Sequence, residues 1–161
     1  MDKIFFALQH SALGTAISES NWFPTIECGH VLCLTIVVGS ILMVDFRLLN
    51  LASRNRPVSE VIADTLPWTW AAFIGAAITG LLLFTSAAGR YVNVWQFDTK
   101  MCVLVLAAIN MLAFHKGAAY KNMAAWDRAP AEPPAAAKLA GALSILCWVT
   151  VITLGRWIGF V

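Results

Sequence analysis

The chain has 161 residues, of which 60% are hydrophobic and only 12% are charged, and its formal net charge is +2. This composition is typical of integral membrane proteins, and the length allows no more than one domain. The basic residues form neither a run nor a face interleaved with aromatic residues, which excludes nucleic-acid binding. The four cysteines all lie in apolar runs, which excludes the disulfide framework of a small secreted domain.

Residues 1–20 predict an uncleaved amphipathic helix on the membrane surface. Its apolar side carries Ile4, Phe5, Leu8 and Ile17, and its apolar core is too short for the central region of a signal peptide. The segment 21–24, Asn-Trp-Phe-Pro, then indicates entry into the bilayer at the level of the head groups.

Four apolar segments predict transmembrane helices, at about 22–50, 66–87, 100–116 and 137–160. The third is expected to continue as a more polar helix to Arg128, before three prolines between residues 130 and 134 end it. Gly75 and Gly80 stand among alanines in the second segment, and small residues of this kind let membrane helices pack closely. The expected fold is therefore all-α: an integral membrane four-helix bundle forming a single domain, 1–161, after the amphipathic surface helix.

The distribution of lysine and arginine predicts the orientation. The first-to-second and third-to-fourth connections hold seven basic residues: Arg47, Arg54, Arg56, Lys116, Lys121, Arg128 and Lys138. The opposite side holds four: Lys3, Arg90, Lys100 and Arg156. Because cytoplasmic loops carry the excess of positive charge, we expect both termini on the periplasmic side.

Ionisable residues inside the spans are the first candidates for function. Glu27, His30 and Asp45 lie in the first span, and such groups cost about 2.5–3.5 kcal/mol each at membrane depth unless they are paired or face the bundle interior. Glu27 and Asp45 are eighteen residues apart, so they share one stripe of a helix, ~27 Å from each other.

The third span runs parallel to the first and carries Lys100, Asn110 and His115. If the two helices pack side by side, Glu27 and His30 meet Lys100 near one surface, and Asp45 meets His115 near the other. These pairs fit two hypotheses. They are either polar contacts that fix the register of the bundle, or part of a cofactor site.

The cofactor hypothesis rests on the histidines. A histidine on a transmembrane helix of a four-helix cytochrome is an axial ligand of b-type haem, because neutral imidazole binds iron and the bundle supplies an apolar sleeve. His30 and His115 are the expected ligands, although they differ in depth. Helix tilt, a single-ligand haem or a ligand from a partner subunit would accommodate that difference, and His10 in the surface helix is a further outer candidate.

Other chemistries have weaker support. Glu27, His30, Asp45, Asn110 and His115 also fit a chain of proton carriers, but the sequence shows no inverted repeat and no interrupted helix. The pattern Cys28-x-His30-x-x-Cys33 is weak as a soft-metal site, because Cys28 points away from His30 on a helix. No hydrolase or phosphate-binding motif occurs in a water-facing segment, so the chain is not expected to act alone on a soluble substrate.

Four segments carry a resemblance to a known group of proteins. These are SALGTAISESNWFPTIECGHVLCL, VDFRLLNLASRNRPVSE, LPWTWAAFIGAAITGLLLF and AINMLAFHKG, in this order. Together they resemble a family of small bacterial inner-membrane proteins with four predicted spans and no assigned function. The shared features match Glu19, Glu27, His30, Asp45, Arg47, Arg56, Pro57, Trp68, Trp70, Gly80, Lys100, Asn110 and His115. His10 departs from the family pattern. The resemblance implies the four-span architecture and the bacterial inner membrane.

We therefore expect a membrane subunit that transfers electrons, through a b-type haem or to a quinone, within a larger assembly. His30 and His115 are the expected haem ligands, and Glu27, Asp45, Lys100 and Asn110 are their charge partners. The alternative is a cofactor-free subunit whose intramembrane charges only hold the bundle or dock a partner. A proton or small-solute conduit comes third. The expected partners are the lipid bilayer and either a protein partner or a second copy of the chain.

Overall fold

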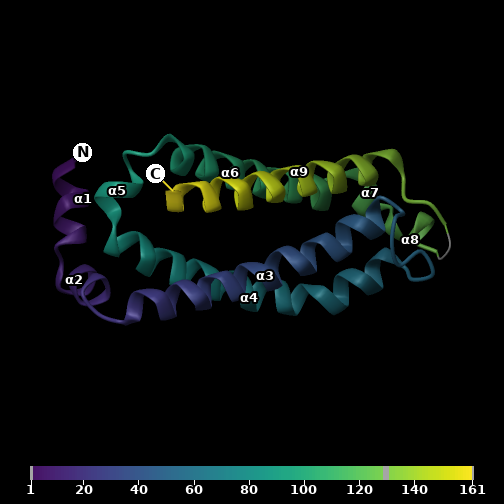
Figure 1. Ribbon diagram of the computed structural model, residues 1–161. Helices are drawn as coiled ribbons and strands as arrows, with labels where there is room; N and C mark the ends of the chain where they lie inside the picture. Colours follow the sequence, from purple (N-terminus) through teal and green to yellow (C-terminus); the bar gives the residue numbers. More distant parts are fainter. Residues whose placement is uncertain (1, 129–130, 161) are drawn as a thin grey trace.

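In the computed structural model, which describes residues 2–128 and 131–160, the chain consists of helices joined by short connections (Figure 1). The long helices are α3 (Trp22–Leu48), α4 (Val58–Ser86), α6 (Trp95–Lys116) and α9 (Ala135–Trp157), and a 3₁₀ turn, Ile158–Phe160, follows α9. The short ones are α1 (Asp2–Gln9), α2 (Ala12–Ser18), α5 (Ala88–Tyr91), α7 (Ala118–Lys121) and α8 (Met123–Trp126). The two described ranges contain no strand.

All four long helices are long and apolar enough to cross a membrane. The shortest, α6, has 22 residues and is therefore ~33 Å long, slightly more than the ~30 Å hydrocarbon core of a bilayer. Large apolar side chains point outward from all four, including Leu32, Ile36, Leu81, Leu106, Ile109, Leu146 and Ile152. The chain is thus an all-α, multi-pass membrane protein whose outer faces contact lipid, which confirms the expected fold class.

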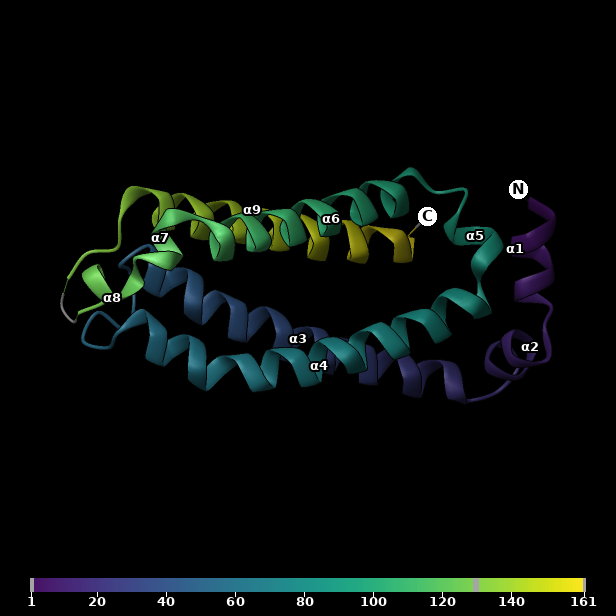
Figure 2. The ribbon, with the colours of Figure 1, turned by 180° about the vertical axis from the view of Figure 1, so that it is seen from behind.

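The long helices form two pairs. α3 packs mainly on α4, and α6 packs on α9, while a contact between α3 and α9 joins the pairs. Figures 1 and 2 show α1, α2 and α5 together at one end of the molecule, and α7 and α8 at the other. We call these the α5 end and the α8 end. Both termini lie at the α5 end.

Two apolar clusters hold the bundle together. Val37, Ala72, Trp148 and Val151 are buried where α3, α4 and α9 meet. At the α8 end, Leu48, Val58 and Ala137 form a second buried cluster. Because both clusters involve α3 and α9, the contact between these two helices is what makes one bundle of the two pairs.

The N-terminal surface segment is two helices rather than one. α1 ends at Gln9, and Ser11 then adopts an extended conformation in which its hydroxyl accepts a hydrogen bond from the Gly14 N–H (3.2 Å). Serine is a favourable N-cap because its side chain satisfies a free N–H group of the first turn. This cap starts α2 as a separate helix.

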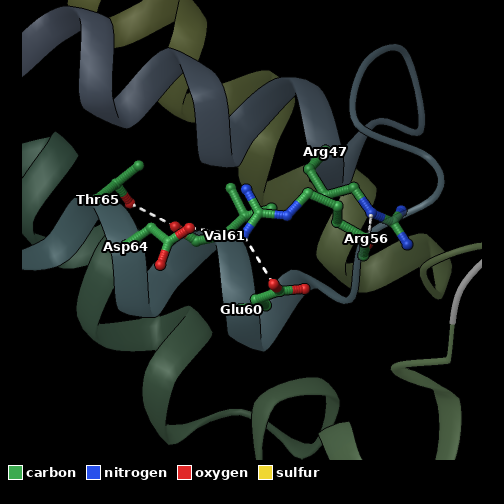
Figure 3. A network of polar contacts seen from close by, with 6 residues as sticks. All are labelled: Arg47, Arg56, Glu60, Val61, Asp64 and Thr65. Carbon is green, nitrogen blue, oxygen red and sulfur yellow. Dashed lines mark hydrogen bonds and ion pairs between the residues drawn. The ribbon is translucent and has the colours of Figure 1, made fainter.

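α4 begins at Val58, earlier than the apolar pattern indicates. The pattern does not include the first two turns of the helix, because they carry charged residues. Glu60 and Asp64 lie one turn apart, and the Arg56 guanidinium bridges both carboxylates at 2.9 and 2.6 Å (Figure 3). The hydrogen bond with Glu60 raises the pKa of the Arg56 guanidinium most, and the one with Asp64 raises it further. The apolar part of α4 starts only near Leu66, where the sequence predicted the span.

α6 ends at Lys116, so the expected continuation of this helix to Arg128 is wrong. Gly117 is extended, and a Cβ on it would lie 2.8 Å from the Ala113 carbonyl oxygen. The chain turns too tightly here for a side chain, and it continues as the single turns α7 and α8. These turns cover the α8 end.

A buried arginine ties the α8 end together. The Arg47 side chain is 1% exposed, and its Nε donates to the Arg56 carbonyl oxygen (2.7 Å) while its two terminal nitrogens donate to Asn50 Oδ1 (3.4 Å) and the Ala131 carbonyl oxygen (3.5 Å). Asn50 has a φ of 58°, the left-handed conformation that commonly ends a helix. Arg47 thus joins the end of α3 to the segments that precede α4 and α9.

Candidate functional site

The side chain with the clearest chemical role at the α5 end is His30, on the third turn of α3. Its Nδ1 lies 3.0 Å from Thr79 Oγ1 on α4. The single hydroxyl proton of Thr79 is donated to the Gly75 carbonyl oxygen (2.7 Å). Thr79 Oγ1 is therefore the acceptor, and Nδ1–H is the donor. The neutral ring keeps its lone pair on Nε2.

The ring of His30 is also fixed by close packing. A Cβ at Gly80 would lie 3.0 Å from His30 Cε1, so the imidazole rests against a backbone with no side chain between them. α4 thus sets both the tautomer and the orientation of His30.

Lys100, on the second turn of α6, is the nearest basic group. It is half-buried and in electrostatic contact with His30, and its stem packs against Gly155 of α9, where a Cβ would lie 3.7 Å from Nζ. Within the described residues no carboxylate forms an ion pair with Lys100. Its ammonium can donate hydrogen bonds at the same end of the bundle as His30.

Glu27 and Tyr91 complete the polar groups at this end. Glu27 is exposed, and its charge acts on both His30 and Tyr91. Tyr91, on α5, is half-buried; burial raises the pKa of its hydroxyl, Arg90 opposes this shift, and Glu27 adds to it. The phenol is therefore a donor at neutral pH. We call Glu27, His30, Thr79, Tyr91 and Lys100 the His30 cluster.

Aromatic rings surround Tyr91. Its ring centroid lies 6.1 Å from that of Phe84 and 5.7 Å from that of Phe97, and Phe84 and Phe97 are stacked at 5.4 Å. Phe5 of α1 meets Phe84 edge-on at 6.2 Å. Rings from α1, α4, α5 and α6 thus form an apolar wall at the end of the bundle where the His30 cluster lies.

The other expected site residues lie toward the α8 end and do not form one cluster. Asp45 is buried against α9, where the Ser144 hydroxyl is its hydrogen-bonding partner. Asn110 Nδ2 donates to the Ala140 carbonyl oxygen (2.9 Å), which links α6 to α9. His115 is exposed, and its Nδ1 lies 2.8 Å from the Met111 carbonyl oxygen of its own helix.

The expected meeting of Asp45 with His115 does not occur among the described contacts. The His115 ring lies against Tyr120, with centroids 4.6 Å apart, and against Phe114. The physical reason is helix arrangement: α3 has α4 and α9 as neighbours, and α6 packs on α9 instead. The two side chains therefore have different neighbours: Ser144 for Asp45, and Tyr120 and Phe114 for His115.

His30 and His115 also lie at different levels. α3 and α6 both run from the α5 end to the α8 end (Figure 1). His30 comes eight residues after the start of α3, ~12 Å along it, whereas His115 comes twenty residues after the start of α6, ~30 Å along it. Two axial ligands of one iron must be level, so these two histidines of one chain do not fit a single haem.

The remaining ligand candidates stand apart. His10 is exposed at the end of α1, where its ring stacks on Phe6 at 4.0 Å. Cys28 is exposed, and Cys33 Sγ would lie 2.8 Å from a Cβ at Gly75 of α4. In the part of the chain that the structure describes, no group of three or more His, Cys, Asp and Glu side chains could hold a metal ion.

Comparison with protein families matches residues 22–161 to "Family of unknown function (DUF6644)". The chain belongs to this family. The DUF6644 match begins at Trp22, the first residue of α3, and thus covers all four long helices and the whole His30 cluster. No curated protein and no solved structure matched the chain.

Thr79, Ser144 and Asp127 are site or anchoring residues of this DUF6644 chain that sequence reasoning did not single out. Thr79 orients His30 and Ser144 partners Asp45, while both Asp127 carboxylate oxygens accept backbone N–H groups of Val58 and Ser59. A hydroxyl in an apolar helix is too common to mark a site, because it can bond to its own preceding turn. Its second role, a hydrogen bond to a side chain of a neighbouring helix, is visible only in the tertiary structure.

Proposed function

We propose that this chain is an electron-transfer subunit of the membrane that binds the head group of a quinol at the His30 cluster. The observation that supports this most is the orientation of His30, whose Nδ1–H is engaged by Thr79 so that Nε2 is left as a base. Oxidation of a quinol releases protons together with electrons. A fixed imidazole nitrogen beside the head group is a suitable acceptor for one of those protons.

Lys100 and Tyr91 supply the complementary donors. A quinol has two oxygen atoms on opposite sides of its ring, and one that donates to His30 Nε2 leaves the other to accept hydrogen bonds. The half-buried ammonium of Lys100 and the protonated phenol of Tyr91 lie at the same end of the bundle. The outward apolar faces of the helices offer the isoprenoid tail a path into lipid.

A haem b held by His30 is the second candidate, and the same hydrogen bond favours it. A metal-ligating histidine usually donates its other ring N–H to a neighbouring group, as His30 does to Thr79. Such a haem supplies one-electron chemistry. Because His115 is not level with His30, its second axial ligand would come from a partner subunit or a second copy of the chain.

We further propose that the chain works with a protein partner in the bacterial inner membrane, with the α5 end on the periplasmic side. The connections between its long helices are short, 49–57, 87–94 and 117–134, so an electron donor or acceptor must come from elsewhere. The seven basic residues of the two connections expected in the cytoplasm gather at the α8 end. This distribution supports the orientation.

One preparation tests these proposals. The protein is purified in mild detergent, its bound quinone is extracted and quantified, and a quinone analogue is titrated while tryptophan fluorescence is followed. We expect His30→Ala and Lys100→Met to weaken analogue binding about tenfold, the equivalent of ~1.4 kcal/mol for a lost hydrogen bond. His115→Ala, at the other end of the bundle, is the matched control and should bind as the wild type does.

Other results of these measurements would favour a different function. A reduced-minus-oxidised visible spectrum of the same sample, with a b-type α band that His30→Ala abolishes and Lys100→Met retains, would favour the haem candidate. Unchanged analogue binding in both variants would overturn the quinol site. A flat spectrum without bound quinone in folded protein would leave the cofactor-free subunit.

A further inference from the structure

Asp45 is the most buried carboxyl group in the described spans, and it takes no part in the His30 cluster. It lies one turn before the end of α3 and is 4% exposed. Its Oδ2 is buried and has no hydrogen-bond partner among the described residues. The Ser144 hydroxyl of α9 is the polar contact of the carboxyl group. Most buried carboxylates are paired or fully hydrogen-bonded, and this one is neither.

α9 packs closely on α3 at Asp45 and supplies no counter-ion to it among the described residues. Gly141 faces the backbone of α3, and a Cβ on it would lie 3.2 Å from the Asp45 carbonyl oxygen and 3.2 Å from Leu48 Cβ. α9 therefore approaches α3 at backbone distance here, and Ser144 of α9 is the polar contact of the carboxyl group.

The charged groups on the surrounding elements are engaged elsewhere or exposed. On α3 itself, the Arg47 guanidinium is bonded to oxygen atoms of three other residues. On α9, Lys138 pairs with Glu132 at 2.7 Å. On α4, Asp64 and Glu60 pair with Arg56 (Figure 3). On α6, His115 and Lys116 point outward and are exposed. None of them forms an ion pair with Asp45.

A carboxylate in this position would be a buried charge without a counter-charge, which is among the costliest arrangements in a protein interior. The neutral acid avoids that cost. One oxygen of the protonated group carries the O–H, and the Ser144 hydroxyl can exchange a hydrogen bond with it. The geometry therefore fits the protonated form of Asp45 and disfavours the ionised form.

We propose that Asp45 is a proton-binding site, occupied while α9 is closed against α3. The proton is held on the carboxyl group between Gly141 and Ser144. Separation of α9 from α3 would admit water to Oδ2, stabilise the carboxylate and release the proton. The site is independent of the quinol proposal, because it lies about fifteen residues of helix, ~22 Å, from His30.

Infrared spectroscopy of the full chain in lipid nanodiscs tests this site. We expect a carbonyl stretching band of a protonated carboxylic acid at neutral pH that shifts in D₂O. Asp45→Asn should remove the band and keep the thermal unfolding temperature close to that of the wild type, since an amide mimics the neutral acid. Glu27→Gln, which changes an exposed carboxyl group on the same helix, should retain the band. Absence of the infrared band, or a band that survives Asp45→Asn, would overturn the proposal.

Discussion

At the scale of the residue, two hydrogen bonds decide what His30 can do. The Thr79 hydroxyl gives its proton to the Gly75 carbonyl oxygen and accepts the Nδ1–H of His30. A histidine in a lipid-facing position would be free to rotate and to exchange tautomers. In this chain the ring is held between α3 and α4, and its basic nitrogen has a fixed direction.

The close approach of His30 to Gly80 gives a prediction at this scale. Gly80→Ala puts a Cβ 3.0 Å from His30 Cε1, so the ring must shift by a few tenths of an ångström and the bond to Thr79 must weaken. We expect weaker binding of the quinone analogue and a loss of stability of about 1 kcal/mol, typical of mild overpacking. Fluorescence titration and thermal unfolding measure the two effects.

The control is Gly39→Ala, on the exposed face of α3. A Cβ there meets no atom within 4 Å, so the substitution should leave analogue binding unchanged. Stability should be equal or slightly higher, because alanine has a higher helix propensity than glycine. Equal effects of the two substitutions would contradict the packing of His30 on Gly80.

At the scale of the element, helix α4 depends on a carboxylate from a distant part of the chain. Pro57 provides no side-chain cap for α4. The Asp127 carboxylate replaces it: Oδ1 accepts from the Val58 N–H, and Oδ2 accepts from the Ser59 N–H at 2.8 Å. A negative charge also interacts favourably with the positive end of the helix dipole.

We therefore expect Asp127→Ala to lower the free energy of unfolding by about 0.5–2 kcal/mol, the usual effect of removing an N-cap. Thermal unfolding in detergent, followed by circular dichroism, measures this. Glu132→Gln is the comparison, because it alters an exposed carboxylate that pairs with Lys138 and should change stability much less. An equal, small effect of both would mean that α4 does not need the cap.

The contact between α3 and α4 gives a second prediction at this scale. A Cβ at Gly75 would lie 3.9 Å from Cys33 Cβ, within the range of disulfides. In a chain with Cys28, Cys102 and Cys147 changed to serine, we expect Gly75→Cys to form a disulfide with Cys33 on mild oxidation, detected by peptide mass spectrometry. Gly39→Cys in the same background should stay reduced, and a disulfide there would contradict this register.

At the scale of the whole molecule, the distribution of basic residues gives a prediction about orientation in the membrane. Both termini lie at the α5 end, away from the connections that carry most of the basic residues (Figure 2). We expect alkaline phosphatase fused after residue 161 to be active, because it would be periplasmic, and the same reporter inserted at residue 53 to be inactive. The opposite pattern would invert the proposed orientation.

The sequence by itself determined the class of molecule and the long helices. The length and apolarity of a span are local properties, because a backbone inside lipid must satisfy its hydrogen bonds within its own helix. For the same reason the apolar pattern locates the part of a helix that lies in lipid, beginning for example near Leu66, even where the helix itself starts earlier. Candidate residues also followed from the sequence, since a histidine or an aspartate inside an apolar run is conspicuous wherever it packs.

Only the tertiary structure decided which residues meet. Helical periodicity places Asp45 and His115 on faces of two helices, but it does not say which helix lies opposite. That choice depends on close backbone contacts, such as that of Gly141 with α3, which form between segments almost a hundred residues apart. They place Asp45 against Ser144 and leave His115 at the surface. The close packing of α3 on α4 likewise brings His30 to Thr79, because shape complementarity between helices is a property of the assembled bundle and of no single segment.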